Sequence, residues 1–383
     1  MSKDKQPEIR FPGFTDEWEE REFSEIVKTT GYKAYLSEAF EVGEYPVIQQ
    51  GDKPILGYSD KKPFENFEDV VLFGDHTLSL YKPETPFLVA TDGLKIITVP
   101  NFSGSFLLSL LEKYVPESQG YKRHFTILKK EQVAFPTDVK ERVLIGEFFT
   151  QIDRTIILHE RELDLLKETK KGFLQKMFPK NGAKVPEVRF PGFTEDWEER
   201  KVFEISKVTY GGGTPKTNTK EFWNGNIPWI QSSDLEINRL FNVSPKKKIT
   251  NEAVKKSAAK IIPPNSIAIV TRVGVGKLAL MPFEYATSQD FLSLSELQID
   301  SYFGIFSLYS MLQKELKNIQ GTSIKGMTKS DLLEKKVTIP KKYEEQQKIG
   351  NFFKQLDDTI ALHQRKLDLL KETKKGFLQK MFV

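Results

Sequence analysis

The chain has 383 residues and a formal net charge of +4, from 57 basic and 53 acidic side chains. This length predicts more than one domain, and so mild a charge means that nucleic-acid affinity would have to come from local basic patches. Because the chain contains no cysteine, disulfide frameworks and thiolate zinc sites are excluded, and a reducing, cytoplasmic setting is expected. No apolar run approaches the roughly 18 residues that a membrane helix needs.

A short signature near the start of the chain occurs twice, as RFPGFTDEWEER over residues 10–21 and as RFPGFTEDWEER over residues 189–200. Its Pro-Gly pair predicts a turn, and Thr15 and Thr194 are candidate helix N-caps. The tryptophan in each copy is expected to be buried. We interpret the signature as a packing motif at the entrance of a domain.

Between the two signatures and after the second, the pattern is one of short apolar runs broken by Gly, Pro, Asn and Asp. This pattern predicts strands in a mixed or mostly β domain, with one helix over 106–114 in the first half and one over 302–320 in the second. The runs that most clearly predict strands are residues 45–50, 69–73, 94–99, 227–231 and 266–270.

The two strand-rich regions can be aligned with each other in the same order. Residues 45–52 match residues 227–234, and residues 87–91 match residues 283–287. Each half of the chain is therefore predicted to hold one variable domain of a shared fold.

A much longer repeat follows each of these domains, over residues 141–178 and again over residues 345–382. The final segments of the two copies, residues 163–178 and 367–382, are identical. The frame of the chain is thus repeated almost unchanged, whereas the domains between the repeats differ.

Within each long repeat the apolar residues follow a heptad pattern, which predicts an amphipathic helix paired with another helix. We expect the two copies to form an antiparallel rod of roughly 54 Å, at 1.5 Å per residue. The alternative is two surface helices on separate cores. Asp138 and Glu141 are a candidate capping box at the start of the first helix, and Pro179 and Gly182 are expected to end it. The predicted seam residues are Ile145, Phe149, Ile152, Ile156, Leu163, Leu166, Ile349, Phe353, Leu356, Ile360, Leu367 and Leu370.

No catalytic motif is recognisable in the sequence. Residues 272–277 resemble a phosphate-binding loop but lack its first glycine and its Ser or Thr. The glycine-rich turn at residues 211–216 is either a flexible turn or a contact for a phosphate. The four histidines show no metal-ligand spacing, so no metal site is predicted. His159 and His363 hold equivalent positions in the two long repeats and are interpreted as packing or polar residues of the seam.

A repeated frame with two differing domains predicts two binding domains held a fixed distance apart about a pseudo-twofold axis. Duplex DNA with two half-sites would suit this arrangement, because protein symmetry mirrors the arrangement of half-sites. Basic and amide side chains in loops are the candidate contacts, since glutamine can pair with adenine. These candidates are Lys33, Gln49, Gln50, Lys53, His76, Lys122, Arg123, Thr214, Lys216, Gln231, Ser232, Ser233, Arg272, Lys277, Lys325 and Lys329.

These segments together resemble the specificity subunit of type I restriction–modification systems. The resemblance rests on both signature copies, on GGTPK at 212–216, on IPWIQSSDL at 227–235, and on VTIP at 337–340 with EQQKI at 345–349. It covers essentially the whole chain. The first half departs from the family pattern, because TGYK at residues 30–33 replaces a GGTP loop and Arg142 replaces a glutamine.

The resemblance implies an α+β fold with two target-recognition domains, residues 1–140 and 187–342, each reading half of a split DNA site. Residues 141–186 and 343–383 would be helical spacers. It also implies two adenine-N6 methyltransferase subunits that use S-adenosylmethionine, and restriction subunits that use ATP and Mg²⁺. The chain itself would bind no cofactor and catalyse no reaction. Two other interpretations stay open: a repeat-built protein-binding scaffold or regulator, and a nuclease with an unrecognised site.

Overall fold

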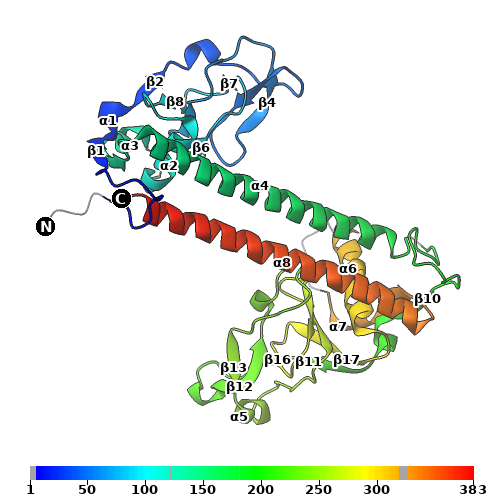
Figure 1. The fold of residues 1–383 in the computed structure, drawn as a ribbon. Helices are drawn as coiled ribbons and strands as arrows, with labels where there is room; N and C mark the ends of the chain where they lie inside the picture. The colour runs from blue at the N-terminus through cyan, green and yellow to red at the C-terminus, as the bar shows by residue number, and fades with distance from the viewer. Residues whose placement is uncertain (1–5, 121, 181, 319–326) are drawn as a thin grey trace. The chain divides into compact units, whose positions relative to one another are not determined.

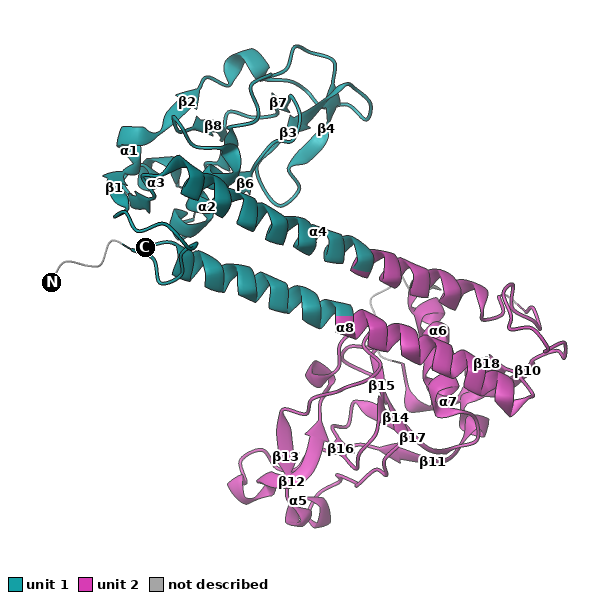
Figure 2. Cartoon of the chain, viewed as in Figure 1, with its two compact units in different colours: residues 1–162, 363–383 teal, residues 163–362 magenta. Residues whose placement is uncertain are grey.

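The computed structural model describes residues 6–120, 122–180, 182–318 and 327–383 (Figure 1). The chain divides into two compact units of mixed helix and strand (Figure 2). Unit 1 comprises residues 1–162 and 363–383, and unit 2 comprises residues 163–362. None of the helices in the described ranges combines the length and the apolar character needed to span a bilayer.

The described residues of unit 1 form three sheets. Strands β2, β8, β5 and β6 form a four-stranded antiparallel sheet in that order, β4, β3 and β7 form a three-stranded sheet, and β1 pairs with β9. The bounds of its elements are β1 Glu19–Glu22, α1 Phe23–Ile26, β2 Lys28–Thr30, η1 Lys33–Tyr35, β3 Tyr45–Ile48, β4 Ile55–Ser59, β5 Val71–Gly74, β6 Leu80–Tyr81, β7 Leu88–Val89, β8 Leu94–Thr98, α2 Gly104–Tyr114, α3 Phe125–Leu128, β9 Gln132–Phe135 and the start of α4, Val139–Lys176.

Unit 2 has the same strand order in its sheets, which are β11-β17-β14-β15, β13-β12-β16 and β10-β18. The bounds of its elements are β10 Glu198–Lys201, η2 Val202–Ile205, β11 Ser206–Gly211, η3 Lys220–Phe222, β12 Trp223–Ile230, η4 Ser232–Asp234, β13 Lys247–Ile249, α5 Asn251–Lys255, β14 Ser266–Val270, β15 Leu278–Met281, β16 Ala286–Thr287, β17 Phe291–Leu297, α6 Ser301–Asn318, α7 Lys329–Glu334, β18 Lys336–Ile339 and the start of α8, Tyr343–Met381.

The fully buried β5 illustrates how the sequence forms the core of unit 1. Its four residues are all buried, and its Phe73 packs in one cluster with Phe106 and Leu110 of α2. Ser103 caps α2, since its hydroxyl accepts a hydrogen bond from the Phe106 N–H at 3.2 Å. The loops that directly follow β3 and β5 carry candidate site residues of unit 1.

The strand registers correct the sequence alignment of the two halves. Val47 of β3 pairs with Leu88 of β7, and the equivalent Trp229 of β12 pairs with Ala286 of β16. Leu88 therefore corresponds to Ala286, whereas the alignment of 87–91 with 283–287 placed it two residues earlier. A shift of two residues keeps the inward and outward faces of a strand unchanged, so the hydrophobic pattern did not reveal the error.

The repeated signature forms a strand entrance rather than a helix start. Trp18 and Trp197 are buried as predicted, but Thr15 and Thr194 cap no helix. The residues after each tryptophan enter β1 and β10, which pair antiparallel with β9 and β18. The N-cap prediction was wrong, because backbone pairing with a distant strand outweighed the local capping pattern.

In unit 1 the first part of α4 packs against the last part of α8, and the two run in opposite directions. Phe148 meets Phe377 edge to face, with ring centroids 5.0 Å apart. Further along, Lys374 binds Asp153 at 2.6 Å. Residue numbers therefore rise along α4 as they fall along α8, as in an antiparallel helix pair.

In unit 2 the last part of α4 packs against the first part of α8 in the same way. Phe173 meets Phe352 with ring centroids 5.1 Å apart, and Lys170 forms an ion pair with Asp357. Burial raises the pKa of the Asp357 carboxyl, and Lys170 opposes that shift. Because Lys170 is buried in this pair, it is not a free surface cation.

None of the predicted seam residues is exposed. Ile145 and Phe149 belong to the core of unit 1, and Ile349 and Phe353 belong to the core of unit 2. The first turns of both long helices thus pack against a domain core, in addition to contacts between the helices.

The start of each long helix is held by a buried ion pair instead of the predicted capping box. Asp138 does accept from the Lys140 N–H at 2.6 Å, but both Glu141 oxygens bind Arg10, at 2.7 and 2.9 Å. Glu345 binds Arg189 in the same two-pronged way, at 2.7 and 2.8 Å. The first arginine of each signature copy thereby joins the start of a long helix to the segment that leads into β1 or β10.

We expect Glu141→Ala to lower the free energy of unfolding by about 3–5 kcal/mol, because it leaves the Arg10 guanidinium largely buried and unpaired. Urea unfolding followed by circular dichroism measures this loss. The control is Glu147→Ala, which removes an exposed carboxylate from the same helix and should change stability by less than about 0.5 kcal/mol. Equal losses in the two variants would contradict the assigned role of Glu141.

Candidate nucleic-acid interface

In unit 1 the loops that follow β3 and β5 are joined by hydrogen bonds. Gln50 accepts from the His76 N–H at 3.2 Å, and the Gly51 N–H donates to the Ser79 hydroxyl at 2.9 Å. Gln50 and His76, both predicted from the sequence as candidate contacts, are therefore neighbours.

A buried aspartate fixes a third loop beside these two. One Asp75 carboxylate oxygen accepts from the Phe125 N–H at 2.9 Å, and the Asp75 carbonyl accepts from the His124 N–H at 2.9 Å. His124 in turn accepts from the Gln119 N–H at 3.0 Å. The exposed side chains of Lys122 and Arg123 thus project from a loop anchored at the end of β5.

The remaining candidates of unit 1 are less closely connected. The Gln49 side chain donates to the Lys53 carbonyl at 3.0 Å and closes its own turn. Lys33 is exposed in η1, and within the described ranges no hydrogen bond joins its side chain to the other loops. Gln49 uses its amide NH₂ group inside the protein and Gln50 uses its amide oxygen. The oxygen of Gln49 and the NH₂ group of Gln50 are therefore left for a ligand.

In unit 2 the loop after β12 is linked to the turn between β14 and β15. The Lys277 ammonium donates to the Ser232 carbonyl at 3.1 Å. The Gln231 amide donates to the Ser233 hydroxyl at 2.9 Å, and its backbone N–H donates to Asp234 at 2.9 Å. The candidates Gln231, Ser232, Ser233 and Lys277 therefore form one group.

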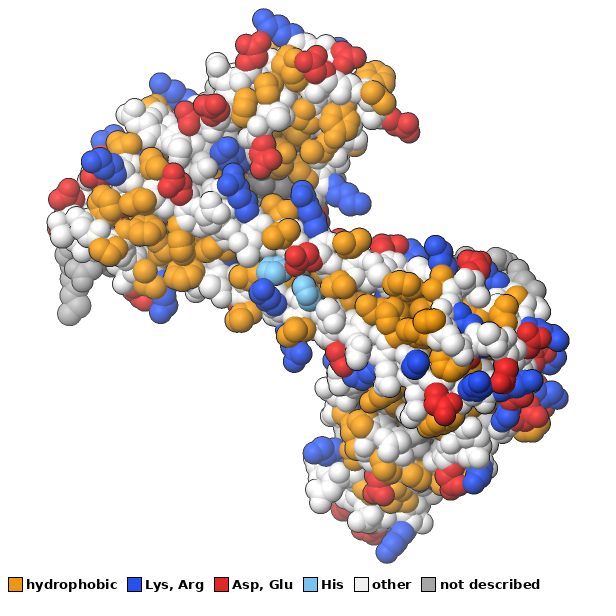
Figure 3. Space-filling view, turned by 45° about the vertical axis from the view of Figure 1, so that its right-hand side comes forward, with side chains coloured by type: hydrophobic (Ala, Val, Ile, Leu, Met, Phe, Trp, Pro, Cys, Tyr) orange, Lys and Arg blue, Asp and Glu red, His pale blue; other side chains and the backbone are white. Residues whose placement is uncertain are grey.

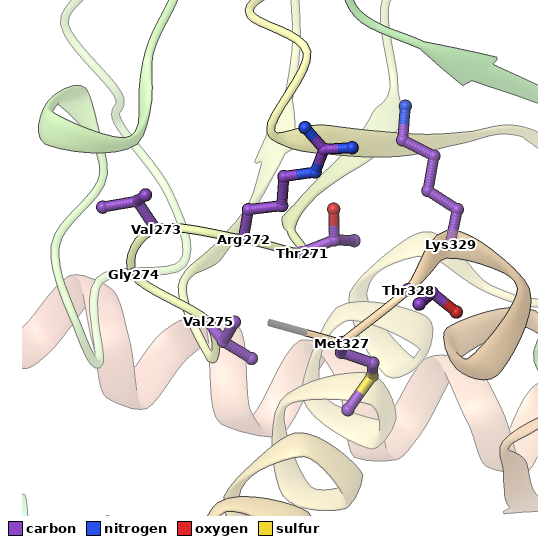
Figure 4. A pocket seen from close by; sticks show the side chains of 8 residues that line it. All are labelled: Thr271, Arg272, Val273, Gly274, Val275, Met327, Thr328 and Lys329. Carbon is purple, nitrogen blue, oxygen red and sulfur yellow. The ribbon is translucent and has the colours of Figure 1, made fainter. Parts of the chain in front are cut away.

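Two further cations border a hollow of about 920 Å³ in the same unit, formed by the turn after β14 and the start of α7. Arg272 and Lys329 extend toward the same side of it (Figure 4). Partial burial lowers the pKa of Lys329, and the positive charge of Arg272 lowers it further. Mutual repulsion of this kind favours an anionic ligand between the two cations. The candidate Lys325 lies outside the described residues.

The glycine-rich turn is tightly packed rather than flexible. A Cβ atom at Gly212 would lie 1.9 Å from the Ser288 carbonyl oxygen, and one at Gly213 would lie 2.4 Å from Ala258. Thr214 donates to Gln289 at 2.6 Å, whereas the exposed Lys216 has no side-chain hydrogen bond to any described residue. The glycines are needed for close approach of the backbone.

Basic residues on the three-stranded sheet of unit 2 were not among the candidates predicted from the sequence. Lys247 of β13 lies 5.7 Å from the ring centroid of Trp223 and 5.8 Å from that of Trp229. The run of three lysines at 246–248 was visible in the sequence. In unit 1 the missed residue is Asp75, whose only sequence signal is its place directly after a buried apolar run.

The fold is that of an internally repeated protein. Its two units have the same strand order, and each contains part of α4 and part of α8. The chain belongs to the type I restriction modification DNA specificity domain family, whose profile matches residues 15–168 and 194–372.

Individual relatives agree with this assignment. The MjaIX specificity subunit of Methanocaldococcus jannaschii is 30% identical over 193 residues, which is 49% of this chain and 44% of that protein. The EcoR124I/EcoR124II specificity subunit of Escherichia coli is 26% identical over 270 residues, 66% of this chain and 63% of that protein. The chain thus spans about half to two thirds of the length of these relatives.

A solved structure resembles the whole fold. The type I restriction–modification S subunit from M. genitalium has a TM-score of 0.67, with 13% sequence identity, and the match covers 99% of both chains. At this identity the likeness shows that the two chains share a fold.

Proposed function

We propose that this chain is the DNA sequence-specificity subunit of a type I restriction–modification complex and reads a split double-stranded site without catalysis of its own. Family membership is the observation that carries the proposal. In this proposal residues 1–140 and 187–342 are the target-recognition domains, and residues 141–186 and 343–383 are the helical spacers. The identical strand order of the sheets in units 1 and 2 supports two related recognition domains.

The loop chemistry suits a nucleic-acid ligand. Arg272 and Lys329 would bind phosphate oxygens, and the hollow that both side chains border supports this role. Such contacts fix position but not sequence. Gln50 and Gln231 stand at equivalent loops of units 1 and 2 and retain amide groups that can hydrogen-bond to adenine. The amide side chains would then distinguish the bases, and the cations would hold the phosphate backbone in position.

The long helices carry a candidate docking surface for partner subunits. Leu158 and Leu165 of α4 are exposed, and so are Leu362 and Leu369, the residues at the same repeat positions in α8. Because both repeats expose leucine at the same positions, these side chains are candidate contacts for another protein. We assign these leucines to contacts with two methyltransferase subunits, which would supply S-adenosylmethionine chemistry, with restriction subunits supplying ATP- and Mg²⁺-dependent cleavage.

The direct test is to express the chain with a methyltransferase partner and to map adenine methylation in the host by long-read sequencing. The proposal requires one bipartite motif with a fixed spacer. A protein-binding scaffold would leave no motif, and that result would refute the proposal.

Replacement of residues 24–136 by the corresponding region of another recognition domain should change one half of the motif and leave the other half unchanged. The reason is that these residues include the candidate loops of unit 1 but none of those of unit 2. Methylation mapping of the hybrid measures both halves. A simultaneous change of both would show that the domains do not read independently.

The double variant Arg272→Ala, Lys329→Ala should bind DNA more weakly at all sequences. Its affinity should also depend less on salt, because each lost phosphate contact reduces the slope of log K against log salt by about 0.9. Fluorescence anisotropy at several salt concentrations measures this slope. Lys207→Ala is the control, since this exposed lysine lies at the opposite end of β11 from the candidate loops. An unaltered slope in the double variant would remove these cations from the interface.

Insertion of one heptad after Thr155 and another after Thr359 should lengthen the DNA spacer. Seven residues keep the apolar pattern in phase and add about 10 Å at 1.5 Å per residue, which corresponds to about three base pairs at 3.4 Å each. Three base pairs also rotate the duplex by nearly a third of a turn, so affinity should fall even at the new optimum. Selection from DNA libraries with random spacer lengths measures both effects, and an unchanged spacer would show that the helices do not set the distance.

A further inference from the structure

A cluster of three potential metal ligands lies on the helix pair within unit 1, apart from the candidate loops. His159 and Glu162 are three residues apart on α4, and His363 comes from α8. One ligand atom from each of the three lies within 4.8 Å of the others. Histidine side chains reach the surface next to an acidic side chain (Figure 3).

The two separations that involve Glu162 are close to those between ligands of one small metal ion. The nearest oxygen of Glu162 is 3.0 Å from Nδ1 of His159 and 3.6 Å from Nδ1 of His363. Two ligands bound to one Zn²⁺ at about 2.1 Å lie roughly 3.0 to 3.5 Å apart at the angles found in tetrahedral and octahedral sites. The pairs that share Glu162 are therefore close to cis-ligand geometry.

An unsatisfied nitrogen gives a second, independent indication. Nδ1 of His363 is buried and has no hydrogen-bond partner among the described residues, although an unpaired buried polar atom is costly. One oxygen of Glu162 lies 3.6 Å from this nitrogen, and the same oxygen lies 3.0 Å from Nδ1 of His159. A cation between the three side chains would satisfy the nitrogen that the hydrogen bonds leave unpaired.

We propose that His159, Glu162 and His363 form a Zn²⁺ site that joins α4 to α8. Two imidazoles and one carboxylate favour zinc or a similar transition metal over Mg²⁺, which prefers oxygen ligands. Water would complete the coordination, because Glu162 and His363 are partly exposed. This site was not predicted from the sequence, because His363 lies on α8, more than 200 residues along the chain from the two ligands on α4.

The repeat predicts one such site per chain. The position equivalent to Glu162 in α8 is Lys366, and the position equivalent to Glu160 is Gln364. A lysine cannot ligate in place of the carboxylate while it is charged, so the second copy of the sequence supplies only His363. The asymmetry of the two repeats also provides a matched control, because Glu160→Gln copies a residue that the other helix already carries.

Isothermal titration of chelator-treated full-length chain with ZnCl₂ tests the proposal. We expect saturable binding of one Zn²⁺, unaffected by excess Mg²⁺, and a zinc-dependent rise in the melting temperature. Glu162→Gln and His363→Ala should each weaken zinc binding by at least about tenfold and remove the rise. Glu160→Gln should retain both.

Glu162→Gln keeps the size of a partly exposed side chain, and circular dichroism checks that its helix content is unchanged. Failure of the unaltered chain to bind one equivalent of zinc would overturn the proposal. Equal zinc affinity in Glu162→Gln and Glu160→Gln would do the same, since it would place the metal elsewhere. Neither outcome bears on the proposed DNA specificity, which is tested by methylation mapping.

Discussion

The core of each unit depends on a phenylalanine brought by a long helix that begins in the other unit. In unit 1, Phe382 follows α8 and its ring centroid lies 5.9 Å from that of Trp18. In unit 2, Phe178 follows α4 and lies 6.2 Å from Trp197 and 5.7 Å from Phe303. Both rings are buried in these cores, so the exchanged helix ends contribute to the packing of both units.

This exchange explains why the long repeats are so similar while the domains differ. The end of each repeat must fit a pocket formed by a signature tryptophan, and the start of each must present the glutamate that binds Arg10 or Arg189. Those contacts constrain the frame at both ends. The loops that follow β3, β5 and their equivalents carry no such constraint, which leaves their side chains available for recognition.

The sequence was informative wherever a pattern was long. The heptads predicted the extents of α4 and α8 well. The short apolar runs located β3, β8 and β14. Local signals failed where a distant residue competed for the same group, as Arg10 does for Glu141 and as β9 does for the backbone after Trp18. Base readout could not be predicted at all, because the orientation of Gln50 depends on a bond to His76 in another loop.

The contact of Phe382 with the first unit also determines when that unit can fold during synthesis. Trp18 and Phe106 leave the ribosome long before α8 has been translated, and until then the site that receives Met381 and Phe382 is open to solvent. Unit 2 lacks this delay, since the ring of Phe178 precedes the domain that it completes. The nascent first unit therefore exposes the apolar residues of this site until α8 has been translated, and transiently exposed apolar surface of this kind favours aggregation.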